Sequence, residues 1–191
     1  MPVYIAFLRG INVGGHNKIK MAELKNSLQT LGLQNIKTYI QSGNVIFESK
    51  DSEVALQERI QTKIKDDFEI TSTVVIRTAD QLHQLVSKAP FSEQEITEAT
   101  TSAKGECLHV AMLPESPKES NATKFLVYTN EKERCVIDGR DVYLLFYESI
   151  RNSKLHNNLK LLEVPATVRN WRTLNKILLI IKDYEENKGQ K

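Results

Sequence analysis

Tyr39-Ile-Gln-Ser-Gly-Asn-Val-Ile-Phe47 is the stretch that most clearly indicates the fold, because it places a glycine-containing turn between two apolar runs. The runs Ile36–Gln41 and Asn44–Phe47 have the length of short strands. Either Ser42-Gly43 or Gly43-Asn44 can supply the positive φ angles of a tight turn. The stretch therefore predicts a β-hairpin.

The segments on either side of this hairpin extend it to the order strand, helix, hairpin, helix, strand. Apolar residues recur at helical spacing in Met21–Leu31 before the hairpin and in Asp51–Asp67 after it. Val3–Leu8 is an apolar run of strand length, and Thr71–Arg77 is rich in β-branched residues. This order is that of the ferredoxin-like, or split βαβ, arrangement.

The second half of the sequence repeats this order. The stretch from Val136 to Phe146 has the same succession of apolar, polar, glycine, polar and apolar residues as the first hairpin. Leu108–Leu113 is expected to be a strand, and the C-terminal segment Val168–Tyr184 a long helix. We therefore expect an α+β protein with two tandem ferredoxin-like halves, consistent with an internal duplication. Further helices are predicted at residues 78–89, 116–126 and 155–162.

A polar segment rich in Ser, Thr and Glu, residues 91–106, separates the two predicted halves. We predict an N-terminal ferredoxin-like half at residues 1–90 and a linker at 91–106. Residues 107–191 then form a C-terminal α+β half that ends in the long helix. The alternative is one domain in which 91–106 is a long surface loop.

Composition places the chain among ordinary globular proteins. Of its 191 residues, 40% are hydrophobic and 26% charged, and a net charge of +2 does not in itself indicate nucleic-acid binding. Cys107 and Cys135 lie in apolar runs without metal-ligand spacing, which predicts reduced, buried thiols in a cytoplasmic protein. We expect no signal peptide, no membrane-spanning run and no metal site.

Basic residues are distributed unevenly along the chain. Residues 149–182 contain seven basic residues and one acidic residue, and residues 1–22 contain three basic residues and no acidic one. If these segments meet in the fold, one pole of the molecule is positive and attracts an anion. Solvated surface charges without a ligand are the alternative.

The segment Arg9-Gly-Ile-Asn-Val-Gly-Gly-His-Asn-Lys18 follows the first strand and approximates a phosphate-binding P-loop. His16 and Asn17 stand where that motif requires Lys and Ser or Thr, so a nucleotide triphosphatase is not expected. Gly14 and Gly15 can still present backbone N–H groups to an anion. Alternatively, they are simply needed for positive φ in a tight connection. Positive charge nearby comes from Arg9, Lys18 and Lys20.

Two further segments contain candidate ligand contacts. The turn at Gln41–Asn44 offers amide and hydroxyl groups that can bind a base edge or a sugar, although the same residues are ordinary turn chemistry. Thr167–Lys176 is predicted to open the last helix, capped by Thr167 or Asn170, and a helix N-terminus near arginines attracts anions. The alternative to an anion site is that Trp171 belongs to the core and the arginines are solvated without a ligand. The candidate ligand-binding residues are Arg9, Asn12, Gly14, Gly15, Lys18, Lys20, Gln41, Ser42, Asn44, Lys154, Arg169, Asn170 and Thr173.

Several of these segments together resemble the signatures of the uncharacterised bacterial family called domain of unknown function 1697. The resemblance implies an α+β fold with duplicated ferredoxin-like character, and it implies no established activity. The family commonly has Lys at the position of His16, so a site that requires this lysine is in doubt. The matching segments are Leu8–Gly15, Lys20–Leu24, Thr38–Phe47 and Ala166–Thr173.

Three hypotheses of function follow. The first is a binding module that holds a phosphorylated small molecule, RNA or DNA at a basic pole formed by the Gly10–Lys20 loop and the Thr167–Lys176 helix start. The second is an enzyme of phosphoryl or nucleotidyl chemistry, with Mg²⁺ held by carboxylates near the Gly10–Lys20 loop. The third is a structural or oligomeric protein without a small-molecule site. The sequence identifies no catalytic residue, cofactor or oligomeric state, and the aromatic signature of RNA-binding RRM sheets is absent. The candidate carboxylates are Glu23, Asp138 and Asp141.

Overall fold

The computed structural model describes residues 1–186, which form an α+β protein with two four-stranded antiparallel sheets. The chain divides into two compact units. The N-terminal unit contains Met1–Gln84 and residues 177–186, and the C-terminal unit contains Leu85–Lys176. The division passes through two helices, α3 (Ala79–Ser87) and α7 (Trp171–Glu186).

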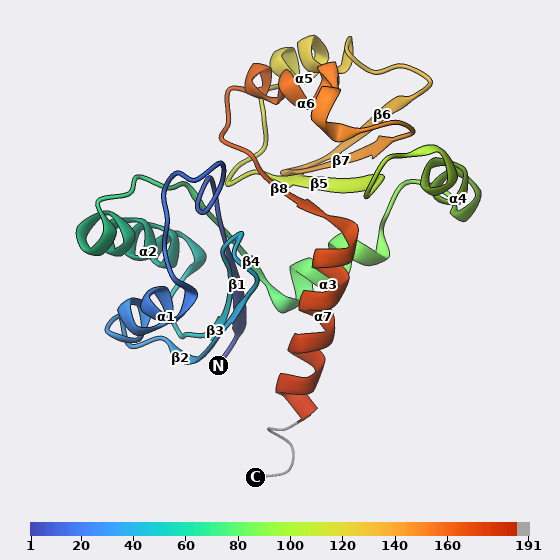
Figure 1. Ribbon diagram of the computed structural model, residues 1–191. Coiled ribbons are helices and arrows are strands. Elements are labelled where there is room, and N and C mark those ends of the chain that lie inside the picture. Colours follow the sequence, from blue (N-terminus) through green and yellow to red (C-terminus); the bar gives the residue numbers. More distant parts are fainter. Residues whose placement is uncertain (187–191) are drawn as a thin grey trace. The chain divides into compact units, whose positions relative to one another are not determined.

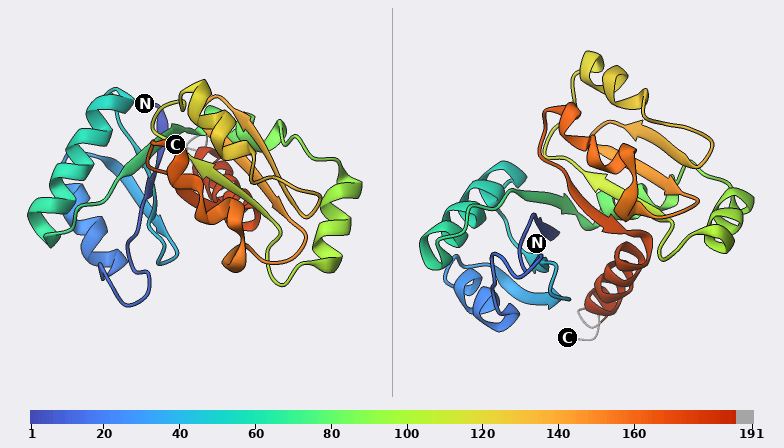
Figure 2. Two further views of the ribbon diagram at one scale, coloured as in Figure 1. Left: turned by 90° about the horizontal axis from the view of Figure 1, so that it is seen from above. Right: turned by 45° about the horizontal axis from the view of Figure 1, so that its top comes forward.

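The N-terminal unit is built on a sheet with the strand order β2-β3-β1-β4. Helices α1 and α2 lie on the same face of this sheet (Figures 1 and 2). In the antiparallel register Phe7 pairs with Asn44, and Leu8 pairs with Val74. The end of β1 therefore lies beside the starts of β3 and β4. The elements are β1 (Val3–Leu8), α1 (Met21–Gln29), β2 (Gln34–Tyr39), β3 (Asn44–Glu48), α2 (Glu53–Phe68) and β4 (Val74–Thr78).

One apolar core joins these helices to the sheet. Alternate residues of β1 belong to it, as expected for a strand with one face against helices. From α2 it includes Leu56, Ile60 and Ile64, whose spacing of four places them on one face of the helix. Ile11 and Ile19 of the Gly10–Lys20 loop also belong to this core, so both ends of the loop are anchored by burial.

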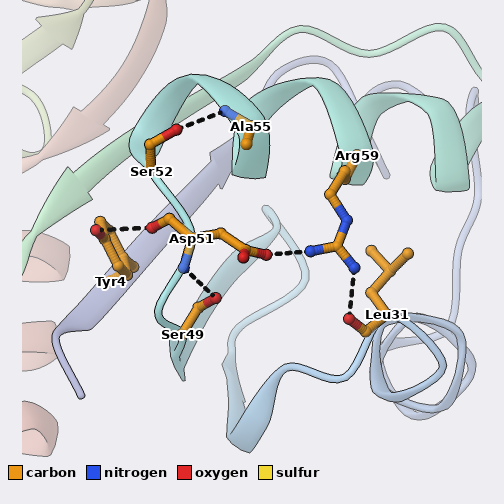
Figure 3. A network of polar contacts seen from close by, with 7 residues as sticks. All are labelled: Tyr4, Leu31, Ser49, Asp51, Ser52, Ala55 and Arg59. Carbon is orange, nitrogen blue, oxygen red and sulfur yellow. Dashed lines mark hydrogen bonds and ion pairs between the residues drawn. The ribbon is translucent and has the colours of Figure 1, made fainter.

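A polar network ties the start of α2 to the end of α1 (Figure 3). The Arg59 guanidinium pairs with the Asp51 carboxylate and donates to the Leu31 carbonyl oxygen at 2.7 Å. The Tyr4 hydroxyl donates to the Asp51 carbonyl oxygen at 3.1 Å. Leu31 lies just beyond Thr30, the C-cap of α1, so the Arg59 side chain joins α2 to the chain that leaves α1.

The C-terminal unit contains the second sheet, with the strand order β6-β7-β5-β8. Its core combines β5 and β7 residues with Phe125 of α5 and with Leu155, Leu159 and Leu162 from the segment that follows β7. Where a single helix was predicted at 155–162, the chain forms the short helix α6 and the 3₁₀ turn η2, and a further 3₁₀ turn, η1, precedes them. The elements are α4 (Glu93–Ser102), β5 (Leu108–Met112), α5 (Glu119–Leu126), β6 (Glu133–Asp138), β7 (Asp141–Phe146), η1 (Ile150–Asn152), α6 (Lys154–Asn157), η2 (Leu159–Leu162) and β8 (Thr167–Asn170).

The predicted start of the long C-terminal helix was wrong. Residues Thr167–Asn170 form strand β8, in which Val168 pairs with Ala111 of β5. The β-branched residues at 167 and 168 favour this strand. Asn170 then caps α7, because its Oδ1 accepts a hydrogen bond from the Thr173 N–H at 2.8 Å.

The segment predicted as a polar linker, 91–106, contains helix α4. A capping box opens it: the Ser92 hydroxyl accepts from the Glu95 N–H at 3.2 Å, and the Glu95 carboxylate accepts from the Ser92 N–H at 2.7 Å. The Ser and Thr residues that follow have low helix propensity, which explains why the composition indicated a loop.

Two further observations concern the cysteines and the apolar character of the helices. Cys107 and Cys135 are both free thiols. None of the helices within residues 1–186 combines the length and the apolar character that crossing a bilayer requires.

Candidate functional site

Both glycine-rich motifs lie at the same end of the N-terminal sheet, which we call the loop end. Here β1 ends at Leu8 while β3 begins at Asn44 and β4 at Val74. The connections at this end are the Gly10–Lys20 loop, the hairpin turn at residues 40–43 and the segment that precedes β4. The fold thus brings together two segments that are 20 residues or more apart in the sequence.

Asn12 determines the form of the Gly10–Lys20 loop. Its Nδ2 donates to the carbonyl oxygens of Ile19 at 3.0 Å and Gln41 at 2.8 Å, and its Oδ1 accepts from the Ile19 N–H at 2.8 Å. Its φ of 53° lies in the left-handed region, which Asn tolerates better than most residues. The side chain therefore holds the loop closed and ties it to the hairpin turn.

Gly14 and Gly15 form the centre of a tight turn between Val13 and His16. Their φ angles are 58° and 80°, and the His16 N–H donates to the Val13 carbonyl oxygen at 3.0 Å. Two positive φ angles at the central positions define a type I′ turn. This conformation accounts for both glycines, and binding of an anion by their N–H groups stays a prediction.

The hairpin turn packs directly against the start of the Gly10–Lys20 loop. The Leu8 N–H donates to the Gly43 carbonyl oxygen at 2.9 Å. A Cβ atom on Gly43 would lie 2.6 Å from Ile11 Cδ1 and 2.9 Å from Leu8 Cβ, and the φ of Gly43 is 81°. Only glycine fits this contact without a shift of its neighbours.

The polar residues of the hairpin turn differ in their exposure. Asn44 is fully buried, and its Nδ2 donates to the Tyr39 carbonyl oxygen at 2.9 Å and to Ser42 Oγ at 3.1 Å. Gln41 is exposed, and Ser42 is partly buried. Of the three predicted ligand contacts in this turn, Gln41 therefore presents the most side-chain surface.

The basic residues predicted for this site lie on its surface. Arg9, Lys18 and Lys20 are exposed, and Lys20 forms an exposed ion pair with Glu23 at 3.3 Å. Such exposed pairs are weak. Helix α1 begins directly after Lys20 and has no side-chain hydrogen bond at its N-cap. The first N–H groups of α1 therefore add partial positive charge to the loop end.

An open hollow of about 260 Å³ adjoins Arg9. The Arg9 N–H donates to the Thr73 carbonyl oxygen at 2.9 Å, and its carbonyl oxygen accepts from Ser72 Oγ at 2.7 Å. Both partners line the hollow, so its wall is continuous with the start of the Gly10–Lys20 loop. The lining residues are Gln61, Thr62, Lys65, Thr71, Ser72 and Thr73.

Two exposed apolar side chains, Val13 and Ile40, lie on the loops that Asn12 ties together. Val13 is 62% exposed and Ile40 is 45% exposed. The φ of Ile40 is 50°, which is an outlier for a β-branched residue. Sequence reasoning missed Ile40 because it continues the apolar pattern of the preceding strand.

The remaining predicted site residues belong to the C-terminal unit. Lys154 is exposed at the start of α6, whereas Arg169 is buried and its Nη1 donates to the Val168 carbonyl oxygen at 2.9 Å. Burial lowers the pKa of Arg169 to about 10. Asn170 and Thr173 form the cap of α7. The basic pole shared with the Gly10–Lys20 loop stays a prediction.

The carboxylates considered for metal binding are divided between the two units. Glu23 belongs to the N-terminal unit and pairs with Lys20, and Asp138 and Asp141 belong to the C-terminal unit. Among residues 1–186 no three His, Cys, Asp or Glu side chains form a group that could hold a metal ion.

His109 of β5 is a buried titratable group that the sequence did not single out. Its ring meets Phe146 edge-on, with 5.7 Å between centroids. Burial lowers the pKa of His109 to about 4, and the charge of His156 contributes to the same shift. A hydrogen bond with the Cys107 backbone has a weaker, opposite effect. This setting favours the neutral imidazole and a structural role.

The fold and the loop end define an α+β protein with a glycine-rich, basic loop surface. Its similarity to other proteins identifies the family. Residues 1–143 match the family described as proteins of unknown function (DUF1697), and the chain belongs to that family. It is also similar to the conserved bacterial protein SP0830 from Streptococcus pneumoniae, with 25% sequence identity and a TM-score of 0.70. The match covers 93% of this chain and 97% of that chain. No curated protein matches the chain.

Proposed function

We propose that the protein binds a ligand through its phosphate groups at the loop end of the N-terminal unit. The observation that carries this proposal is the Asn12 network, which holds the Gly10–Lys20 loop in one form while residues 13–18 of that loop stay exposed. A loop held by three side-chain hydrogen bonds presents its surface with little conformational entropy left to lose on binding.

The charges of the loop end support an anionic ligand. Lys18 and Lys20 lie just before the N-terminus of α1, whose first N–H groups add to their positive potential. Arg9 adds a third exposed basic side chain at the start of this loop. Phosphate is the anion that suits such a combination of ammonium, guanidinium and backbone N–H groups.

We propose a binding function in preference to an enzyme of phosphoryl or nucleotidyl transfer. Glu23, the carboxylate nearest to the loop in sequence, is paired with Lys20. In its wider form the proposal includes the basic residues of the C-terminal unit, among which Lys154, Arg172 and Lys176 are exposed. A cytoplasmic location is part of the proposal and is supported by the unpaired thiols of Cys107 and Cys135.

The test is a fluorescence-anisotropy titration with a labelled single strand of about 12 nucleotides, competed with ATP and with ribose 5-phosphate. Changing both Lys18 and Lys20 to Gln should weaken binding about tenfold and lower the salt dependence by about 1.4 in log–log slope, from two lost phosphate contacts. Lys50→Gln, an exposed lysine beyond the other end of β3, is the matched control. Equal affinities of the double variant and the control would contradict the proposal.

We also infer that the two units descend from one duplicated ferredoxin-like half, with the repeats lying within residues 1–90 and 107–191. The two strand orders correspond position by position. The Leu8 N–H donates to the Gly43 carbonyl oxygen at 2.9 Å, and the Leu113 N–H donates to the Arg140 carbonyl oxygen at 2.9 Å. The same backbone contact thus joins the first strand to the hairpin turn in each unit.

The last strands of the two units support the same inference. Arg77 of β4 and Arg169 of β8 are both buried, and each donates from Nη1 to the preceding carbonyl oxygen at 2.9 Å. The next residue caps a helix in both cases: Thr78 Oγ1 accepts from the Gln81 N–H, and Asn170 Oδ1 accepts from the Thr173 N–H. A chain split between the repeats tests the inference, because independent halves should reassociate and recover the intact circular-dichroism spectrum.

A further inference from the structure

We propose that the ligand of the loop end is a single-stranded nucleic acid, and that Ile40 contacts its bases. This inference rests on the proposed function and names the ligand class of the same surface. It is drawn from the apolar residues of the loop end, which contribute nothing to the binding of phosphate.

The first observation is that the two loops of the loop end carry exposed apolar side chains as well as basic ones. Val13 and Ile40 are 62% and 45% exposed, and the bond from Asn12 Nδ2 to the Gln41 carbonyl oxygen joins the two loops that carry them. His16 and Lys18 follow Val13 on the exposed part of the Gly10–Lys20 loop. A ligand that matches this surface combines negative charge with an uncharged, weakly hydrated face, as a nucleotide does.

The second observation is the backbone of Ile40. Its φ of 50° is costly for a β-branched side chain, and a position of this kind in a turn is normally taken by Gly, Asn or Asp. Burial does not offset that cost, since the side chain is almost half exposed. Backbone strain of this kind is concentrated at functional sites.

The third observation is the shape and polarity of the surroundings. Residues 13–18 are all exposed, which gives an open surface suited to an extended chain. Small molecules are usually bound in concave sites that bury most of their surface. The exposed amide of Gln41 follows Ile40 directly and can donate to or accept from a base edge. A membrane surface fits less well, because interfacial contacts favour Trp, Phe and Leu.

The experiment compares a labelled uridine oligomer of about 12 units with an abasic oligomer of the same length, which keeps the phosphates and lacks the bases. Ile40→Asn is the test variant, because Asn tolerates the left-handed conformation and removes the apolar side chain. Lys50→Gln is the control, and vesicles of phosphatidylcholine and phosphatidylserine form a separate arm. Melting temperatures are measured for all variants.

The unchanged protein and Lys50→Gln should bind the uridine oligomer about fivefold more tightly than the abasic oligomer, a smaller preference than stacking on an aromatic side chain gives. Ile40→Asn should bind both oligomers with the affinity that the unchanged protein has for the abasic one. Its melting temperature should be equal to or higher than that of the unchanged protein. Equal binding of both oligomers by the unchanged protein overturns this inference and leaves the proposed function intact. Binding of neither overturns both, and binding of vesicles alone assigns the surface to a membrane.

Discussion

The two units use the same strand order and differ at the ends where their first strands stop. In the N-terminal unit the connection from β1 to α1 spans residues 9–20, whereas in the C-terminal unit the connection from β5 to α5 spans 113–118, about half that length. In both units a backbone hydrogen bond to the neighbouring hairpin turn is donated where the first strand ends, by Leu8 in one unit and by Leu113 in the other. The short connection shows that this strand arrangement does not require the additional residues of the Gly10–Lys20 loop.

The hairpin turns show the same contrast in packing. Gly43 is in contact with Ile11 and Leu8, so a Cβ atom would overlap both. At Gly139 the nearest atom to an added Cβ is Ser116 Oγ at 3.9 Å. The longer loop of the N-terminal unit is thus held at three points: the buried Ile11 and Ile19, the contact with Gly43, and the hydrogen bonds of Asn12.

The largest expected effect comes from adding a methyl group at the two turn glycines. Gly43→Ala should destabilise the protein by about 3 to 4 kcal/mol, because overpacking adds to the cost of a left-handed alanine. Gly139→Ala, with a φ of 58° and no atom closer than 3.9 Å to the added Cβ, should cost only about 1 kcal/mol. Urea denaturation measures both. Equal losses would mean that the two turns are packed alike.

The second effect concerns two asparagines that differ in the amide atoms they use. Asn12→Asp should cost about 2 kcal/mol, because both donor hydrogen bonds of Nδ2 are lost while the acceptor bond remains. Asn130 of the C-terminal unit accepts through Oδ1 from the N–H groups of Lys132 and Glu133. Asn130→Asp should therefore change stability by less than about 0.5 kcal/mol. If Asn12→Asp leaves the free energy of unfolding unchanged in the same denaturation assay, the Asn12 hydrogen bonds do not hold the loop.

Acidification should affect the C-terminal unit through His109. Its pKa in the folded protein, about 4, lies below the ordinary histidine value of 6.5, so between these values the unfolded chain binds more protons. Stability should therefore decrease as the pH falls below 6.5, by about 2 kcal/mol at pH 5. His109→Gln should remove this part of the pH dependence, and His83→Gln, a change at an exposed residue of α3, should retain it. A slope unchanged in His109→Gln would assign the effect to other groups.

The smallest of the stability effects is expected from two surface arginines. Arg59→Met should cost about 1 kcal/mol, since it removes the charged partner of Asp51 and the donor to the Leu31 carbonyl oxygen. Arg172 lies 3.9 Å from Glu106, and its side chain is 84% exposed. Arg172→Met should be neutral within about 0.3 kcal/mol. Thermal melts at low and high salt distinguish the two, and equal changes would show that the network of Figure 3 adds nothing.

The sequence predicted most elements of the N-terminal unit because their signals are local. The apolar spacing from Met21 predicted α1, and the observed helix also begins there. The helix predicted at Asp51–Asp67 is α2, Glu53–Phe68, and the Ser52 side chain caps it. By contrast, β8 has only four residues and passes directly into α7, so no turn signal separates strand from helix.

The candidate site was predicted in part. The turn at Gly14 and Gly15 follows from two adjacent glycines, which is a local property. The role of Asn12 depends on Gln41, which is 29 residues away, and the need for glycine at 43 depends on contact with Ile11. Arg169 was predicted on an exposed helix face, but it is a buried strand residue. Tertiary contacts of this kind leave no local pattern in the sequence.

The central claim is that the loop end of the N-terminal unit binds the ligand and that the equivalent end of the C-terminal unit does not. A titration of the ¹⁵N-labelled protein with a uridine oligomer of about 12 units, followed by amide chemical shifts, tests it most directly. Shifts are expected at Val13–Lys18 and at Ile40–Gly43, and none at Asp138–Asp141. Shifts at Asp138–Asp141 with none in the Gly10–Lys20 loop would contradict it.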